Sequence, residues 1–199
     1  MFQMNSYFKK IAKVTISLLA FIMKFNFFNH RIIIIQSYDD KRYCDNTRYL
    51  FEYLSCKKIY SIYWTTEDRR IQKYLNSKNF KFISIKSNFL LYVYVYANAK
   101  IIINPGSNYH DLFNLISSST IKITTSHGVG PKLTITPTFD IYNSNKEILE
   151  INNFDYINLT ADFVSIESGV KKFKIPDKKI INLGFPRCDQ FFDKDSIKR

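Results

Sequence analysis

The segment SHGVGPK, residues 126–132, gathers the residue types in this chain that are best suited to chemistry. It holds one of the three histidines, His127, and two of the five glycines, Gly128 and Gly130. The imidazole of His127 can accept a proton near neutral pH, so it is the best general-base candidate. Gly128 and Gly130 let backbone N–H groups approach an anion, and Lys132 adds a positive charge. Together they suit a hydroxyl group that attacks a phosphate or an activated sugar.

A structural interpretation of this segment stays open, because a single histidine at a strand end is often structural and Gly-x-Gly-Pro is often only a turn. The other histidines, His30 and His110, have no sequence neighbours that complete a triad or a metal site. The three cysteines form no metal-ligand spacing and suit a reducing cytoplasm; they are Cys44, Cys56 and Cys188. We therefore expect no metal and no cofactor.

The elements around this segment alternate between apolar strands and helical patterns. Strands are expected at residues 31–37, 58–65, 80–85, 100–104, 120–125, 155–158 and 179–183. Helices are expected at residues 45–56, 67–75, 109–117, 162–172 and 188–192. The aromatic run 89–99 fits either element, and the order of elements favours a helix. This alternation predicts an α/β, Rossmann-like fold with a mainly parallel sheet and helices on both faces.

The position of His127 follows from this fold. Ligands of open parallel sheets bind in the crevice at the carboxyl ends of the strands. The strand expected at 120–125 ends there, two residues before His127. The segments Asn104–Ser107 and Gly184–Arg187 follow other strands and are expected at the same edge.

The composition predicts a folded domain with anionic partners. Hydrophobic residues make up 46% of the chain, which excludes a disordered protein, and the net charge of +12 attracts polyanions. Charge alone does not choose among phosphorylated substrates, anionic lipid and nucleic acid. The aromatic residues fall mostly within the expected elements, where core packing accounts for them, so we expect no nucleic-acid partner.

The N-terminal residues 1–28 are expected to form a basic amphipathic helix, and residues 29–199 the Rossmann-like domain. The first 38 residues carry five basic residues and no acid before Asp39. The apolar stretch 14–23 is too short to span a bilayer. One interpretation is an interfacial helix on the anionic cytoplasmic face of the cell membrane, and the other is a helix packed on its own domain. The basic flank favours peripheral membrane contact.

Three segments resemble motifs of the CDP-glycerol glycerophosphotransferase family of teichoic acid synthesis. They are SHGVGPK (126–132), NLGFPRCDQFF (182–192) and YCDNTRYLFEYL (43–54), and the resemblance covers roughly residues 31–192. It implies a GT-B architecture with two Rossmann-like domains, of which this chain resembles the N-terminal half. It also implies a membrane-associated enzyme that adds glycerol phosphate to a cell-surface polymer acceptor.

The resemblance assigns roles to individual residues. It makes His127 the presumed general base and places Lys132, Arg187 and Asp189 at motif positions expected to bind substrate. Cys188 stands where the family commonly has asparagine, and Gly130-Pro131 departs from its commoner arrangements.

The resemblance also places the start of a second, donor-binding domain near the end of this chain. We therefore expect a truncated product, a fragment or one half of a split enzyme. Such a chain would bind a phosphorylated polymer or lipid-linked acceptor. It would use CDP-glycerol or another nucleotide donor only with a second domain. Two alternatives stay open: a different nucleotide-sugar GT-B glycosyltransferase, and a non-catalytic basic binding module.

Overall fold

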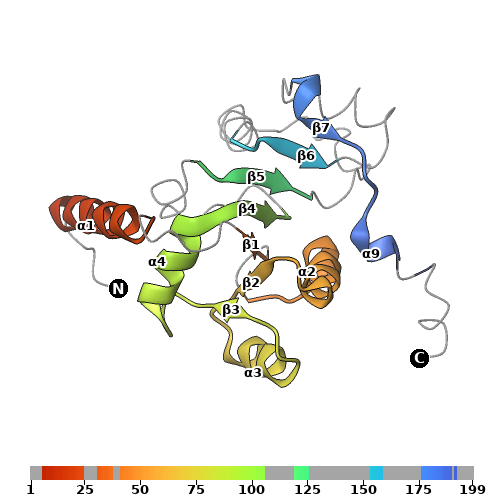
Figure 1. The fold of residues 1–199 in the computed structure, drawn as a ribbon, viewed down its shortest axis with the longest axis horizontal. Coiled ribbons are helices and arrows are strands. Elements are labelled where there is room, and N and C mark those ends of the chain that lie inside the picture. Colours follow the sequence, from red (N-terminus) through yellow and green to blue (C-terminus); the bar gives the residue numbers. More distant parts are fainter. Residues whose placement is uncertain are drawn as a thin grey trace, which may run out of the picture.

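The computed structural model describes residues 6–24, 31–37, 41–105, 119–125, 153–158, 176–189 and 191 (Figure 1). The elements in chain order are α1 (Ser6–Lys24), β1 (Ile32–Ile35), α2 (Asp45–Lys57), β2 (Ser61–Thr65), α3 (Arg69–Ser77), β3 (Phe82–Ile83), α4 (Phe89–Asn98), β4 (Ala99–Asn104), β5 (Ile121–Thr124), β6 (Tyr156–Asn158), the 3-10 turn η3 (Asp177–Lys179), β7 (Ile180–Ile181) and α9 (Pro186–Asp189). The helices expected at 109–117 and 162–172 lie outside the described residues.

The strands form one sheet in the order β3-β2-β1-β4-β5-β6-β7, and every pair is parallel. This confirms the predicted α/β fold with a parallel sheet. The strand order reverses between β1 and β4, which is the switch point where open α/β sheets form their ligand crevice. Ile35 pairs with Ile103 beside this point, and a register shift separates Ile32 from Ile33 farther back.

The core lies on both faces of the sheet, as the continuous apolar run of β1 predicts. Ile32 and Ile34 pack with α1 and α4 on one face. Ile33 and Ile35 pack with α2 and α3 on the other. Figure 1 shows α4 and α2 on opposite sides of the strands. The period-two alternation of a strand therefore buries all four isoleucines.

The ambiguous run after residue 88 is the helix α4, as the order of elements favoured. Asn88 caps it, because its side-chain oxygen accepts a hydrogen bond from the Leu91 N–H at 2.9 Å. The buried rings of Tyr92 and Tyr96 stack with centroids 4.4 Å apart. Residues four apart share a helix face, which explains this pair.

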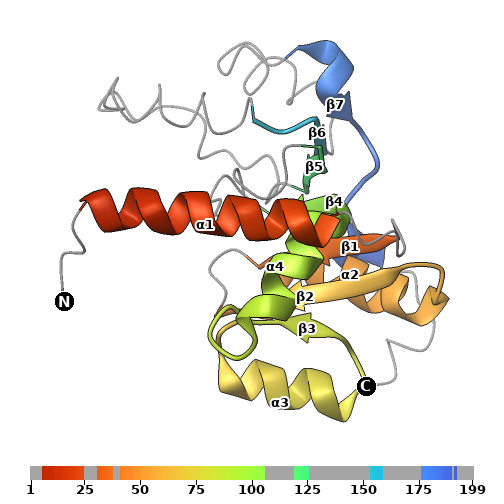
Figure 2. The same cartoon turned by 60° about the vertical axis from the view of Figure 1, so that its left-hand side comes forward.

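Helix α1 packs against α4 (Figure 2). It also presents apolar side chains to solvent. One face, centred on the buried Ala20, packs against the core cluster that contains α4. The opposite face carries four apolar side chains that are 58–68% exposed: Val14, Leu18, Phe21 and Ile22. No helix in the described ranges is both long enough and apolar enough to cross a bilayer.

Candidate functional site

A buried chain of polar side chains crosses the switch point. Gln36, the first residue after β1, donates a hydrogen bond from Nε2 to the Tyr96 hydroxyl at 2.8 Å. Asn104, the last residue of β4, donates from Nδ2 to Gln36 Oε1 at 2.9 Å. All three side chains are at least 97% buried. Buried amides are costly unless they are paired, so these bonds fix the carboxyl ends of β1 and β4 relative to each other.

The end of β5 is joined to the same chain. The Thr125 N–H donates to the Asn104 carbonyl oxygen at 3.0 Å. Thr125 stands two residues before His127, so β5 leads towards the predicted general base at the edge where ligands bind. His127, Gly128, Gly130 and Lys132 themselves lie outside the described residues, and their roles stay predictions.

Two buried hydroxyls at this edge have no hydrogen-bond partner in the structure. They are Ser37 Oγ, after β1, and Thr125 Oγ1, after β5. Both residues are about 95% buried. Buried hydroxyls are nearly always paired, so this edge has unused hydrogen-bonding capacity on both sides of the switch point.

The segment after β7 is held by Asn158, the last residue of β6. The Asn158 amide donates to the Gly184 carbonyl at 2.7 Å and accepts from the Leu183 N–H at 3.0 Å. Gly184 has φ of 78°, a conformation that favours glycine. The amide therefore fixes the turn of the Gly-Phe-Pro-Arg motif before α9 begins.

Arg187 joins this motif to the start of α2. Its Nη1 lies 2.9 Å from Asp45 Oδ1, and its backbone N–H donates to Asn46 Oδ1 at 3.3 Å. Its guanidinium also lies 5.0 Å from the Phe185 ring centroid. The segments 43–54 and 182–192, far apart in the chain, are thus in contact (Figure 1).

The structure therefore locates two of the six predicted site residues. Arg187 is tied to Asp45 yet keeps 40% of its side chain exposed. Asp189 is exposed at the end of α9. The described ranges contain no group of three or more metal-ligating side chains.

Sequence reasoning missed the buried polar chain. A signal was present, because Gln36 and Asn104 are polar residues placed where apolar strands end. Tyr96 carried no such signal, since it sits within an aromatic run that reads as core. Pairing it with a residue 60 positions away required the fold.

Comparison with known proteins places this site in a family. Residues 18–199 match the family model of the CDP-glycerol:poly(glycerophosphate) glycerophosphotransferases. The chain belongs to this family. The match confirms the resemblance seen in three short motifs and favours the glycerophosphotransferase interpretation over both alternatives. A search of curated protein sequences finds no significant match.

Solved structures of the wall teichoic acid polymerase TagF share the fold of this family member. One TagF structure is 18% identical, with a TM-score of 0.62 over all of this chain and 51% of that one. A His-to-Asn variant soaked with CDPG is 17% identical, with a TM-score of 0.62 over 98% of this chain and 52% of that one. The chain thus spans about half the length of these structures, and at this identity the likeness shows the fold.

Proposed function

We propose that this chain is the acceptor-side part of a glycerophosphotransferase that adds glycerol phosphate to a cell-surface polymer. The observation that carries the proposal is the family match over residues 18–199. The parallel sheet supports it, because β5 ends at Thr124, three residues before His127, at the ligand-binding edge. The donor is CDP-glycerol, bound with the help of a second domain. The acceptor is a phosphorylated polymer or a lipid-linked primer.

In the proposed reaction, an acceptor hydroxyl oxygen attacks the phosphorus atom of the glycerol phosphate group. His127 takes the hydroxyl proton as the new P–O bond forms. The bond from that phosphorus to the bridging oxygen breaks, and CMP leaves with the electron pair. Lys132 and the N–H groups around Gly128 and Gly130 stabilise the charge on the phosphoryl oxygens.

Arg187 and Asp189 complete the proposed site from the other motif. The Asp45 carboxylate orients the Arg187 guanidinium, a group that is suited to binding phosphate oxygens. Asp189 is exposed two residues farther on and offers a carboxylate to polyol hydroxyl groups.

The test joins this chain to a matching donor-side domain and measures CMP release from CDP-glycerol with a polymer acceptor. His127→Ala should slow release by about 10²–10⁴-fold, as expected for loss of a general base. His30→Ala is the matched control and should keep the rate. Full activity of His127→Ala would return this histidine to a structural role. Rapid CMP release by the 199-residue chain alone would contradict the assignment of donor binding to a second domain.

We also propose that α1 holds the enzyme on an anionic membrane, which would bring it to a lipid-linked acceptor. One face of α1 packs against α4, while the opposite face exposes Leu18 and Phe21. Lys9, Lys10 and Lys13 add positive charge near the start of the same helix. A helix with an exposed apolar face and neighbouring lysines is suited to an anionic bilayer surface.

A further inference from the structure

An open surface cavity of about 470 Å³ lies between α2 and α3, at the carboxyl ends of β1 and β2. One wall comes from the segment between β1 and α2, with Lys41 and Tyr43. Another comes from Arg48 in α2. The third comes from the start of α3, where Asp68, Arg70 and Tyr74 line it. Its size suits a small ligand or one segment of a chain, and neither Arg187 nor Asp189 lines it.

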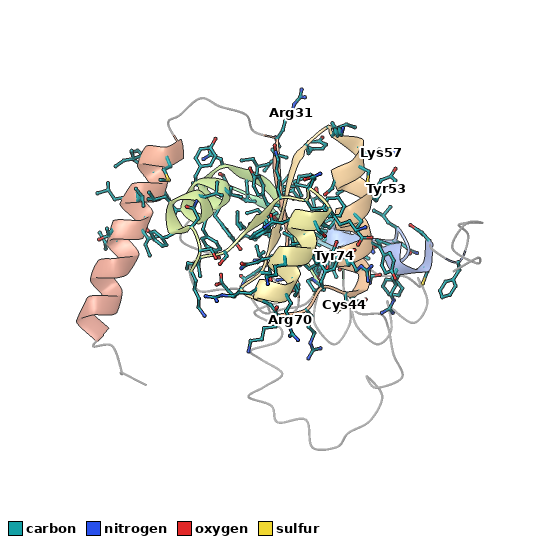
Figure 3. The ribbon with its side chains drawn as sticks, turned by 90° about the horizontal axis from the view of Figure 1, so that it is seen from below. Arg31, Cys44, Tyr53, Lys57, Arg70 and Tyr74 are labelled. Atoms are coloured by element: carbon teal, nitrogen blue, oxygen red, sulfur yellow. The ribbon has the colours of Figure 1, made fainter. Side chains whose placement is uncertain are left out.

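Cationic side chains outnumber acidic ones in this lining. Among the described lining residues, the cations are Lys41, Arg48 and Arg70, and the one carboxylate is that of Asp68. Figure 3 shows Arg70 and Tyr74 of α3 near Cys44, the residue that precedes α2. The segments that follow β1 and β2 thus place positively charged side chains around the same cavity.

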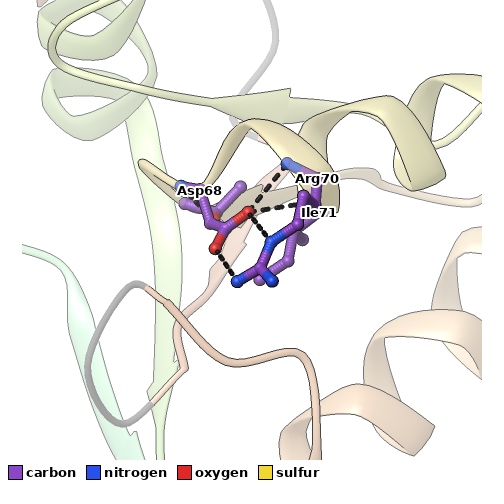
Figure 4. Close-up of polar contacts among 4 residues, drawn as sticks. Asp68, Arg70 and Ile71 are labelled. Carbon is purple, nitrogen blue, oxygen red and sulfur yellow. Dashed lines mark hydrogen bonds and ion pairs between the residues drawn. The ribbon is translucent and has the colours of Figure 1, made fainter.

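Asp68, one of the lining residues, caps the start of α3 and pairs with Arg70 (Figure 4). Its Oδ1 accepts hydrogen bonds from the backbone N–H groups of Arg70 at 2.7 Å and Ile71 at 3.4 Å. Its Oδ2 lies 3.0 Å from Arg70 Nη2. These bonds hold the pKa of Asp68 at about 2, below its ordinary value of 3.8. The carboxylate stays ionised, and its oxygens accept hydrogen bonds from the first N–H groups of α3 and from the Arg70 side chain.

Arg70 keeps donor capacity that this pairing does not use. Its Nε and Nη2 point to Asp68, and its side chain is 91% exposed. An exposed ion pair of this kind adds little to stability, so stability alone does not account for a cation held at the cavity mouth. A guanidinium that pairs with a carboxylate through Nε and Nη2 can still offer Nη1 to a phosphate, although the carboxylate competes for its charge.

Arg48 is held more firmly on the α2 side. Its Nε lies 3.0 Å from Glu52 Oε1, and its guanidinium carbon lies 5.2 Å from the Tyr43 ring centroid. The Tyr43 hydroxyl donates to the same Glu52 oxygen at 2.9 Å. The guanidinium is therefore fixed between a carboxylate and a ring, which lowers the entropy cost of binding an anion.

Two tyrosines give the cavity an amphipathic wall. The rings of Tyr43 and Tyr74 are tilted, with centroids 5.4 Å apart. Tyrosine combines an apolar face for C–H groups with a hydroxyl for polar ones. Cations beside such rings fit a ligand that alternates phosphates with polyol carbons.

We propose that this cavity is a subsite for a phosphodiester unit of a polyol-phosphate chain, and this rests on the proposed function. Arg48 and Arg70 bind the phosphate oxygens, and the two tyrosines contact the polyol. β2 and β5 are separated by three strand intervals, or roughly 14 Å at ~4.8 Å each. A chain of several units can therefore span from the cavity to the end of β5, whereas a single unit cannot.

A lipid headgroup offers the same phosphate chemistry but fits the arrangement less well. The exposed apolar face belongs to α1, which packs with α4 on one face of the sheet. The cavity lies between α2 and α3, which cover the other face. A bilayer contacted by α1 is therefore on the far side of the sheet from Arg70.

The test measures binding of a defined glycerol-phosphate oligomer of about six units to the full chain by titration calorimetry. Arg70→Gln should weaken binding by about 3–10-fold through loss of a charge-assisted contact. Arg69→Gln is the matched control, because it removes the same charge from the neighbouring residue, which does not line the cavity. Asp68→Asn keeps a good helix cap and removes the competing carboxylate, so it should tighten binding by about 2–5-fold.

Several outcomes would overturn the inference. No binding by the unaltered chain would do so, as would equal losses in Arg70→Gln and Arg69→Gln, or no gain in Asp68→Asn. Anionic vesicles that bind in an Arg70-dependent manner while the oligomer does not would assign the cavity to a lipid headgroup. Oligomer binding is measured on this chain alone and CMP release on the chain joined to a donor-side domain, so the two readouts are separate. The subsite can thus fail while His127-dependent transfer stands, and the reverse also holds.

Discussion

Arg187 Nη1 lies 2.9 Å from Asp45 Oδ1, across 142 residues of sequence. This contact fastens α9 to the first residue of α2, and Asn46 reinforces it by accepting the Arg187 N–H. The ionic pair is partly exposed, so we expect a modest energy from it. Its main effect is positional, because it holds two motif segments together at the carboxyl edge of the sheet.

A double-mutant cycle measures this contact. Asp45→Asn suits the position, because asparagine also tolerates the positive φ of 65° found there. Asp45→Asn and Arg187→Gln should each lower the free energy of unfolding, and their coupling should be about 0.5–1 kcal/mol in urea denaturation. Strictly additive losses would mean that the pair does not interact in solution.

The buried polar chain should contribute to stability through the Tyr96 hydroxyl. Tyr96→Phe leaves the Gln36 Nε2 donor without this acceptor, so we expect a loss of about 1–3 kcal/mol in the free energy of unfolding. Tyr94→Phe, in the same helix and less buried, is the matched control and should cost much less. Equal effects of the two changes would contradict the buried network.

Asp68 makes stability depend on acid pH. Its pKa is lowered to about 2 in the folded chain, so its contribution to the free energy of unfolding is fully present only above about pH 5. That contribution is lost as the pH falls from about 5 through about 2, because protonation breaks the bonds to Arg70 and Ile71. Asp68→Asn cannot titrate and should lack this part of the pH dependence. Urea denaturation at pH 6 and pH 2.5 checks it. A difference between the two proteins that does not shrink on acidification would contradict the assignment.

The exposed face of α1 should control membrane binding without affecting the fold. Leu18→Ser with Phe21→Ser should weaken sedimentation with anionic vesicles and leave the melting temperature nearly unchanged. Leu19→Ser, on the packed face, should lower the melting temperature instead. Glutamate at Lys9, Lys10 and Lys13 should cost about 1 kcal/mol of binding per position on an anionic surface. Equal vesicle binding by all variants would remove the membrane role.

Much of the fold followed from local pattern. The isoleucine runs of β1 and β4 could only be strands buried on both faces, and their alternation with helices indicated a parallel sheet. The run after Asn88 was ambiguous, because its aromatics alternate as in a strand. In the structure the run is a helix that Asn88 caps. The sequence alone does not show whether a cap or an alternating pattern determines the element.

The site was predictable only where a motif marked it. Arg187 and Asp45 each stand in a recognised motif, but their pairing was not predicted, since nothing local joins residues so far apart. Arg48 and Arg70 gave no signal, because single basic residues on predicted helices usually belong to a solvated face. Their convergence depends on where β1 and β2 end, which only the folded sheet decides. Helix α1 both packs on the domain and exposes apolar side chains, a combination that its amphipathic pattern alone does not predict.

The pairing of β1 with β4 also governs how the chain folds during synthesis. Ile33 sits opposite Ile101, so a nascent β1 lacks this neighbour until 68 more residues have been made. At roughly 5–20 residues per second, translation of that stretch takes about 3–14 s. During this interval β1, which is apolar on both faces, has at least one unpaired strand edge, a form that aggregates readily. Yield in cells should therefore depend on chaperones that cover this segment until β4 arrives.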